Sequence, residues 1–219
     1  CKVNQYETEA MAELFADSGY EIKEFTEVAD VYVINTCSVT NMGDRKSRQI
    51  IRRAKKLNPN AVIAVTGCYA QTAPDEVLAI EGVNLVLGTK DRKNIVTLVE
   101  ELNTESNINH VSDIMSNHEF EELQIKQYSN RTRAFIKIQE GCNQFCSYCI
   151  IPYARGPVRS RAKDDVVREI KELAHNGFKE IILVGIHVAS YGVDLGDTTL
   201  ESLIMDVDKI DGVERIRLS

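Results

Sequence analysis

Short, nearly all-apolar segments alternate along this chain with stretches of helical periodicity, and this alternation limits the folds that the chain can adopt. The clearest apolar segments are residues 30–37 (DVYVINTC) and 61–68 (AVIAVTGC). Such runs are typical of strands in a parallel sheet that is covered on both faces. Between them, a stripe of apolar and small side chains recurs at helical spacing, at Ser47, Ile50, Ile51, Ala54 and Leu57. The pattern predicts an α/β fold.

The first half of the chain is interpreted as one domain, residues 1–103. A helix over residues 4–19 is expected to end at Gly19, because glycine readily takes the left-handed conformation found at helix ends. The further predicted elements are a helix near 74–80, a strand over 84–88 and a helix over 93–102. Their order predicts a parallel-sheet, flavodoxin-like α/β domain.

A polar segment without sustained periodicity, residues 104–132, is interpreted as a flexible linker with room for one weakly paired strand. The last segment, residues 133–219, alternates again. Strands are predicted over 133–139, 179–185 and 213–219, and helices over 163–177, closed by Gly177, and over 200–210. Three βα-type units that end on a strand predict a truncated TIM-type barrel.

Three of the six cysteines lie within eight residues, at Cys142, Cys146 and Cys149. Thiolates are the usual ligands of a cubane 4Fe–4S cluster, and three of them leave one iron open to a small molecule. Zinc is the competing metal, although zinc loops usually contain two C-x2-C pairs or nearby histidines. Disulfides are the other alternative, but a chain of 219 residues does not need such crosslinks. The spacing favours a cluster and a reducing, cytosolic setting.

The other three cysteines occupy equivalent places in the predicted topology. Cys37 and Cys68 each follow a predicted strand, and Cys1 precedes the first helix, where a preceding strand would end. The carboxyl ends of parallel strands share one edge of a sheet, so the three thiols are expected to converge. Each could instead be a small buried hydrophobic residue. Three in the same topological position favour a second metal site.

The net charge of −7 hides a strong segregation of charge. Residues 1–30 hold eight acidic groups and two lysines, whereas residues 42–56 hold seven basic groups and one acid. Arginine binds phosphate in a bidentate way, which suits contact with a nucleic acid. The alternative is a solvated helix face with i,i+4 ion pairs. The candidate RNA-contacting residues are Arg45, Arg48, Arg52 and Arg53, with Arg159 and Arg161 from a second basic run after the cysteine cluster.

The cluster C-x3-C-x-aromatic-C, in which the aromatic residue is Tyr148, resembles the signature of radical S-adenosylmethionine enzymes. Four stretches together are similar to the methylthiotransferases, and most similar to the MtaB type. They are residues 1–11 (CKVNQYETEAM), 35–54 (NTCSVTNMGDRKSRQIIRRA), 66–71 (TGCYAQ) and 140–161 (EGCNQFCSYCIIPYARGPVRSR). Enzymes of that type add a methylthio group to C2 of N6-threonylcarbamoyladenosine at position 37, beside the tRNA anticodon.

The resemblance implies two 4Fe–4S clusters and S-adenosylmethionine as cofactors. One cluster, on Cys142, Cys146 and Cys149, binds and cleaves S-adenosylmethionine to a radical that removes hydrogen from adenine C2. The other, on Cys1, Cys37 and Cys68, carries the sulfur, and a second S-adenosylmethionine supplies the methyl group. The residues expected near the cofactor are Tyr148, Gly185, His187 and Arg155, although His187 suits a structural loop equally well.

The resemblance also implies a tRNA substrate, an electron donor of the flavodoxin or ferredoxin type and a cytoplasmic location, and leaves the sulfur donor open. No run of about 18 apolar residues is present, so no membrane span is expected. Family members precede Cys1 with a strand and complete the barrel, so this chain is expected not to turn over alone. Rival interpretations are methylthiolation of isopentenyladenosine or of a ribosomal-protein aspartate, an iron–sulfur carrier, and a plain RNA-binding domain.

Overall fold

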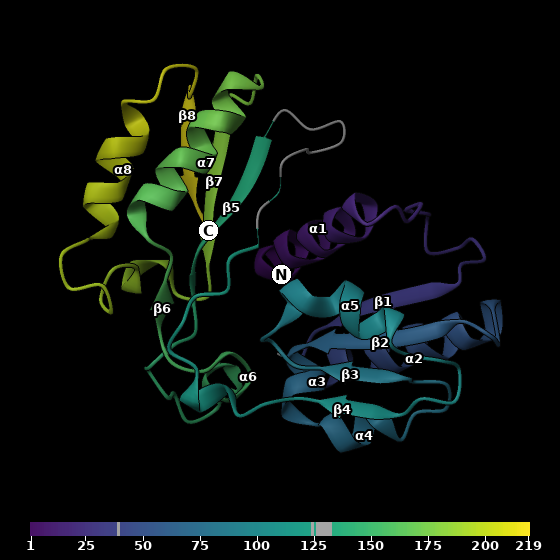
Figure 1. The fold of residues 1–219 in the computed structure, drawn as a ribbon. Helices are drawn as coiled ribbons and strands as arrows, with labels where there is room; N and C mark the ends of the chain where they lie inside the picture. The colour runs from purple at the N-terminus through teal and green to yellow at the C-terminus, as the bar shows by residue number, and fades with distance from the viewer. Residues whose placement is uncertain (39, 124, 126–132) are drawn as a thin grey trace.

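The structure is a computed structural model that describes residues 1–38, 40–123, 125 and 133–219. Within these residues the chain forms two four-stranded sheets, one from each half of the sequence (Figure 1). Helices pack on both sheets, so the α/β class that the alternating pattern predicts is confirmed. Of the predicted linker, residues 124 and 126–132 lie outside the described part of the chain.

The N-terminal sheet is parallel throughout. Its strands, in order, are β1 (Val31–Thr36), β2 (Val62–Gly67), β3 (Leu85–Leu87) and β4 (Ile108–His110). Thr36, the last residue of β1, pairs with Gly67, the last residue of β2, so the carboxyl ends of these strands lie side by side. Strand β4 pairs with β3 and is the weakly paired strand that the linker segment allowed. This sheet therefore extends past residue 103.

Helices cover both faces of this sheet because its strands are apolar on both sides. Side chains of Ile63 and Val65 pack in one cluster with Ile51, while that of Ala64 packs in another with Met11. The first face carries α2 (Asn41–Leu57), α3 (Cys68–Thr72) and α4 (Pro74–Leu78), and the second carries α1 (Lys2–Asp17) and α5 (Ile95–Glu100). Successive strand residues point to opposite faces, which explains the division.

The apolar stripe on α2 is narrower than its spacing predicts. Ser47, Ile51 and Ala54 are buried, but Ile50 is 41% exposed. The helix ends elsewhere agree with the sequence. Gly19 follows α1 with a φ of +90°, and Gly177 follows α7 (Lys163–His175) with the same φ. Both glycines take the left-handed conformation expected after a helix.

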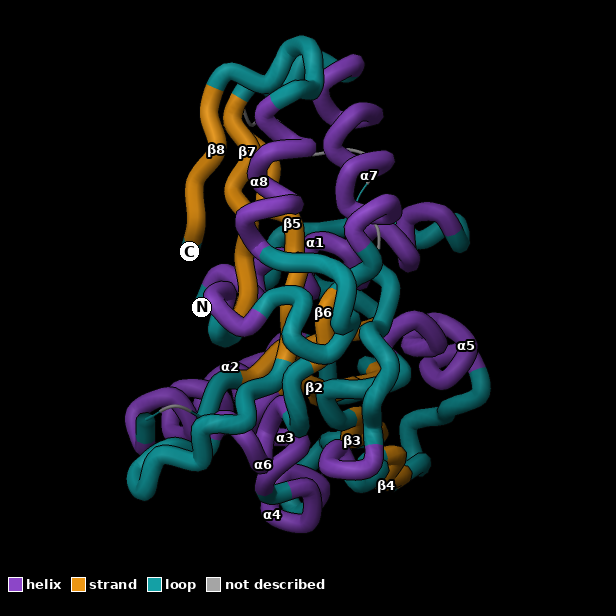
Figure 2. The backbone as a smooth tube through the Cα atoms, turned by 90° about the vertical axis from the view of Figure 1, so that its left-hand side faces the viewer, coloured by secondary structure: helices purple, strands orange, loops and turns teal. Residues whose placement is uncertain are grey.

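The C-terminal sheet has the βα order of a truncated barrel, as predicted. Its strands, in order, are β6 (Arg159–Ser160), β5 (Arg133–Glu140), β7 (Glu180–Gly185) and β8 (Arg215–Leu218). Strands β5, β7 and β8 are parallel, and β6 is antiparallel to β5. Figure 2 shows α7 and α8 (Leu200–Asp208) along one face of these strands. Short elements that were not predicted are α3, β6, α6 (Ile151–Arg155), η1 (Arg92–Asn94), η2 (Ile114–Ser116) and η3 (Val188–Ser190).

Helix α1 contributes to the cores of both halves. Near its start, Val3 and Tyr6 are buried against residues of β5 and β7. Further along, Met11 and Phe15 are buried against the N-terminal sheet. In Figure 1 the helix runs between the two sheets. Because one helix belongs to both cores, the halves of the chain share a packed interface.

Candidate functional site

The loop between β5 and α6 carries Cys142, Cys146 and Cys149, and its backbone doubles back sharply. The backbone N–H of Cys142 donates to the carbonyl of Gly156 at 3.0 Å. Gly141 has a φ of +75°, and a Cβ there would lie 1.8 Å from the carbonyl oxygen of Pro157. Only glycine tolerates both the conformation and the close approach. The EGC sequence therefore folds the loop back toward α6.

All three thiols of this loop are free, and that of Cys146 is exposed. The N–H of Cys149 donates to the carbonyl of Cys146 at 2.9 Å, which forms a turn, and Tyr148 between them is 91% exposed. In the part of the chain that the structure describes, no three His, Cys, Asp or Glu side chains are gathered closely enough to share one metal ion. A cubane cluster requires its thiolates to lie further apart than the ligands of a single metal ion, since each thiolate binds a different iron. Three free thiols on one looped segment fit that donor set.

The remaining thiols lie at the carboxyl edge of the N-terminal sheet. Cys37 and Cys68 directly follow the paired residues Thr36 and Gly67. Cys1 caps the start of α1, where its Sγ accepts from the N–H of Asn4 at 3.4 Å. The side chain of Asn4 also donates to the carbonyl of Thr36 at 2.9 Å, next to Cys37. These contacts connect Cys1 to the strand end that carries Cys37.

Arg155 connects this edge to the C-terminal half. Its Nη2 donates to Oδ1 of Asn4 at 2.6 Å, and its Nε donates to Sγ of Cys68 at 3.3 Å. Arg155 is fully buried and lies in α6, six residues after Cys149 in the sequence. The two sets of three cysteines therefore flank one buried interface between the halves of the chain.

Buried charges fill the same interface. Lys137 Nζ lies 3.1 Å from Oε2 of Glu140, and Nη1 of Arg155 lies 2.7 Å from Oε1 of the same carboxylate. Glu7 of α1 pairs with Arg155, with Lys137 at 3.3 Å and with Arg92 at 2.5 Å. We call this set the interface network. Its members are Glu7, Arg92, Lys137, Glu140, Arg155 and Arg159, all 1% exposed or less.

The network keeps its carboxylates ionised. Burial by itself raises the pKa of Glu7, but Arg155, Arg92 and Lys137 outweigh burial and lower that pKa to about 2. Burial likewise raises the pKa of Glu140, and the nearby cations, Lys137 first, hold it well below its usual range. Burying a charge is costly unless it is paired, so each member depends on the others. The interface is a set of interdependent ion pairs rather than an open cleft.

Two of the residues predicted near the cofactor lie at the carboxyl end of β7, Gly185 as its last residue and His187 two residues further on. The N–H of exposed His187 donates to Oε1 of Gln139 at 2.8 Å, and its Nδ1 lies 2.6 Å from Oγ of Ser190. A Cβ on Gly185 would lie 2.9 Å from the same Gln139 oxygen. Both therefore lie at the barrel edge that also carries the cysteine loop, whereas Arg155 lies in the interface network.

The predicted RNA-contacting arginines divide into two groups. On α2, Arg45, Arg52 and Arg53 are exposed, and Arg48 donates to the hydroxyl of Tyr69 at 3.0 Å. Arg159 and Arg161 are instead buried. Arg159 pairs with Glu140 at 3.6 Å, and Arg161 pairs with Glu122 at 2.8 Å and also with Glu169. Burial in carboxylate pairs does not favour contact of these two with RNA.

Sequence reasoning did not single out Glu7, Arg92, Lys137 or Glu140 as site residues. Apart from Lys137 and Glu140, which are three residues apart, their partners lie far apart in the chain, so little local pattern marks them. One signal was present, because Lys137 interrupts an otherwise apolar strand segment, FIKI. A lysine at 1% exposure in such a strand requires a buried carboxylate partner.

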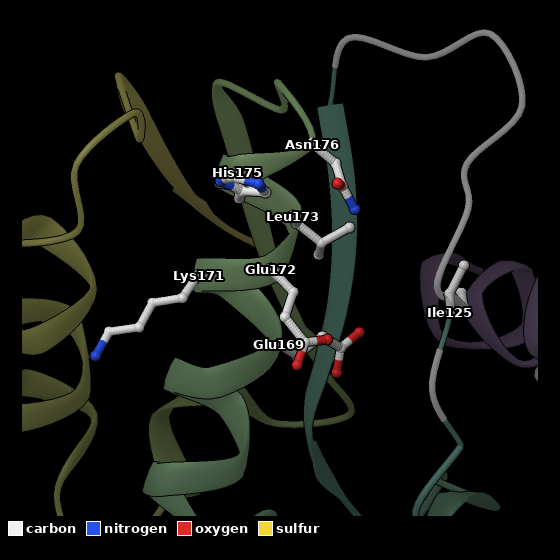
Figure 3. A pocket seen from close by; sticks show the side chains of 7 residues that line it. All are labelled: Ile125, Glu169, Lys171, Glu172, Leu173, His175 and Asn176. Carbon is white, nitrogen blue, oxygen red and sulfur yellow. The ribbon is translucent and has the colours of Figure 1, made fainter.

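A pocket of about 500 Å³ lies beside α7 and is drawn in Figure 3. It is lined by Ile125, Glu169, Lys171, Glu172, Leu173, His175 and Asn176. None of these is a cysteine, and the carboxylate of Glu169 is paired with Arg161. We therefore assign the candidate site from the two cysteine sets and their shared interface. No helix in the described residues is both long and apolar enough to cross a membrane.

Comparison with known families defines the class of protein. Residues 136–219 match the Radical SAM superfamily, and residues 1–88 match the family described as Uncharacterized protein family UPF0004. Residues 136–219 therefore form a radical SAM domain, and the cofactors of that class are a 4Fe–4S cluster and S-adenosylmethionine. A solved structure of the radical S-adenosylmethionine methyltransferase TsrM from Kitasatospora setae, with cobalamin and a 4Fe–4S cluster bound, shares the fold. Its TM-score is 0.60 at 16% identity, covering 92% of this chain and 48% of that chain.

Individual relatives show which enzymes of this class the chain resembles most specifically. The threonylcarbamoyladenosine tRNA methylthiotransferase MtaB of Bacillus subtilis is 52% identical over 100% of this chain and 49% of the relative. MtaB of Aquifex aeolicus is 43% identical over 100% of this chain and 53% of the relative. A tRNA-2-methylthio-N(6)-dimethylallyladenosine synthase from Sulfurihydrogenibium is 37% identical over 100% of this chain and 51% of the relative. The resemblance to methylthiotransferases is confirmed, and the chain spans about half the length of the curated relatives it matches.

Proposed function

We propose that the chain forms the two cluster-binding domains of a tRNA methylthiotransferase that modifies C2 of N6-threonylcarbamoyladenosine at position 37, beside the anticodon. The observation that carries the proposal is the pair of cysteine sets on either side of one buried interface. Cys142, Cys146 and Cys149 belong to the domain that matches the Radical SAM superfamily. Cys1, Cys37 and Cys68 lie at the carboxyl edge of the other domain, the edge at which open parallel sheets bind ligands.

The chemistry of adenine C2 supports this assignment. Its C–H bond is not acidic, so general-base catalysis does not activate it. When bound, the cofactors supply the radical and the sulfur that this carbon requires, and the protein positions them. The loop cysteines would hold one 4Fe–4S cluster, with one iron left for S-adenosylmethionine, and the strand-end cysteines would hold a second. Tyr148, which is exposed beside Cys149, would contact S-adenosylmethionine together with Gly185 and His187 at the carboxyl end of β7.

The tRNA would be bound in part by the basic face of α2. Arg45, Arg52 and Arg53 are exposed there, and α2 begins four residues after Cys37. Arginine on an open helix face suits contact with phosphate. A tRNA substrate places the reaction in the cytoplasm, and reduction of the clusters requires an electron donor of the flavodoxin or ferredoxin class.

The test is nucleoside analysis of tRNA from a strain that lacks the gene. The methylthio form of N6-threonylcarbamoyladenosine should disappear while the unmodified nucleoside accumulates, and a plasmid copy of the gene should restore it. A plasmid copy that carries Cys142→Ala should not restore the methylthio form. An unchanged level of the methylthio form in the deletion strain contradicts the proposal. Loss of methylthio-isopentenyladenosine instead supports the alternative activity, which the relative from Sulfurihydrogenibium favours.

A different class, an iron–sulfur carrier, is separated by a second assay. The complete enzyme, when reduced, should cleave S-adenosylmethionine to 5′-deoxyadenosine, whereas a carrier should not. The match of residues 136–219 to the Radical SAM superfamily favours cleavage. The same assay distinguishes an RNA-binding domain with structural cysteines, which would also leave S-adenosylmethionine intact.

A further inference from the structure

The guanidinium of Arg155 has every one of its hydrogens engaged. Nε donates to Sγ of Cys68 at 3.3 Å, Nη1 donates to Glu7 and, at 2.7 Å, to Glu140, and Nη2 donates to Oδ1 of Asn4 at 2.6 Å and to Glu7 at 3.0 Å. Arginine has five N–H donors in a rigid planar fork. The four other bonds therefore fix the direction in which Nε–H points, which is toward the sulfur of Cys68.

The Asn4–Arg155 pair also reaches the other two thiols of the N-terminal domain. Asn4 contacts Cys1 Sγ at 3.3 Å through its side chain and donates to the carbonyl of Thr36, the residue before Cys37. Cys68 itself is 4% exposed, so water does not replace the Arg155 donor easily. Arg155, from the radical SAM domain, thus contacts Cys68 directly and is connected through Asn4 to Cys1 and to the residue before Cys37.

We propose that Arg155 is a positioning residue for the cluster on Cys1, Cys37 and Cys68, and that its Nε–H bond to the Cys68 sulfur raises the reduction potential of that cluster. The proposal rests on the proposed function, which places a cluster on these thiols. Hydrogen bonds to cluster sulfurs are among the factors that set such potentials. A charge-assisted donor stabilises the more negative, reduced state over the oxidised one. Because Arg155 follows Cys149 by six residues, the radical SAM loop would tune the neighbouring cluster.

The alternative is that Arg155 only neutralises Glu7 and Glu140. Arg92 provides the matched control for that role. It is equally buried and pairs with the same two carboxylates, at 2.5 Å and 3.5 Å, but it has no sulfur contact among the described bonds. Lysine preserves the charge at either position and lacks the fork that aims Nε–H. Comparing Arg155→Lys with Arg92→Lys therefore separates the sulfur contact from the charge.

The experiment uses the chain with Cys142, Cys146 and Cys149 replaced by alanine, so that one cluster remains after anaerobic reconstitution. Potentiometric titration followed by electron paramagnetic resonance should give a lower midpoint potential for Arg155→Lys than for its parent. Arg92→Lys should titrate like the parent. Equal potentials in all three proteins overturn the proposal and leave the proposed function intact. Failure of the parent itself to bind a cluster overturns both.

A second measurement does not require an Arg155 variant to fold. In the parent protein with ¹⁵N-labelled arginine, the reduced cluster should show a ¹⁵N hyperfine coupling in pulsed electron paramagnetic resonance. The coupling should persist in labelled Arg92→Lys, which places it on another arginine. A parent protein whose reduced cluster shows no ¹⁵N coupling contradicts the Arg155–Cys68 bond.

Discussion

Arg155 of α6 and Glu7 of α1 meet in the buried interface, where Nη2 of the guanidinium lies 3.0 Å from Oε2 of the carboxylate across 148 positions of sequence. Arg155 belongs to the radical SAM domain, and Glu7 belongs to the N-terminal domain. Both side chains are fully buried, so replacing either one with a neutral residue would leave the charge of the other buried without this partner. The pair thus couples the stability of the N-terminal domain, residues 1–88, to that of the radical SAM domain.

Substitution Glu7→Gln tests this coupling. Breaking a buried ion pair by removing one partner costs about 3–5 kcal/mol, because the cations left behind lose their compensating charge. We expect urea unfolding, followed by circular dichroism, to report a loss of stability in that range. Glu21→Gln is the control, since this exposed carboxylate pairs with Lys23 at 3.5 Å on the surface. Its effect should stay within about 0.5 kcal/mol, and a loss as small in Glu7→Gln would contradict the network.

The pKa of Glu7 predicts an acid-dependent part of the stability. The folded-state pKa is about 2, below the ordinary value of 4.5. Between these values the unfolded state binds more protons, so the contribution of Glu7 is fully present above pH 4.5 and is lost as the pH falls toward 2. The stability difference between wild type and Glu7→Gln should therefore shrink over this window in unfolding curves measured at several pH values. A stability difference between the two proteins that increases as the pH falls would contradict the lowered pKa of Glu7.

Gly141 provides a test of the cysteine loop. A Cβ on this residue would meet the carbonyl oxygen of Pro157 at 1.8 Å, in a backbone with φ of +75°. Gly141→Ala should displace the loop and reduce iron bound to Cys142, Cys146 and Cys149. Gly196→Ala is matched in conformation, with a φ of +79°, but has nothing within 4 Å of the added carbon. It should cost about 1 kcal/mol and keep its iron. Equal iron in the two variants would show that the loop does not need the glycine.

The basic face of α2 predicts a salt-dependent affinity for tRNA. Replacing Arg52 by glutamine should weaken binding and lower the slope of log affinity against log salt concentration by about 1, as expected for the loss of one phosphate contact. Lys179→Gln is the control, since this exposed lysine pairs with Glu214 at 2.6 Å in the C-terminal half. Binding curves at several salt concentrations check both variants. A slope for Arg52→Gln identical to that of the wild type would instead support the alternative that α2 presents only a solvated helix face.

The sequence predicted the strands well because their residues leave little choice. Segments such as VYVINT and VIAVTG are apolar enough to be buried on both faces, and Gly19 ends its helix as its conformational freedom suggests. Strand β6 was missed because two residues, Arg159 and Ser160, carry no periodicity. Strand β4 was left in a linker because its three residues are polar or exposed.

The interface could not be predicted from the sequence for a different reason. Arginines are mostly exposed, so the run containing Arg155, Arg159 and Arg161 suggested a cofactor or RNA surface. Each is buried here because a carboxylate distant in sequence, such as Glu7, lies against it. The spacing of Cys142, Cys146 and Cys149, in contrast, is local. The other three thiols were singled out because each occupies the same place in the predicted topology, at the end of a strand.

The central claim is that the two cysteine sets hold two clusters, and iron analysis tests it most directly. Iron, acid-labile sulfide and zinc would be counted per chain after anaerobic reconstitution. We predict about eight irons in the wild-type chain, and about four when either set of three cysteines is replaced by alanine. Zinc in place of iron, or about four irons in wild type that vanish completely with one set, would contradict the claim.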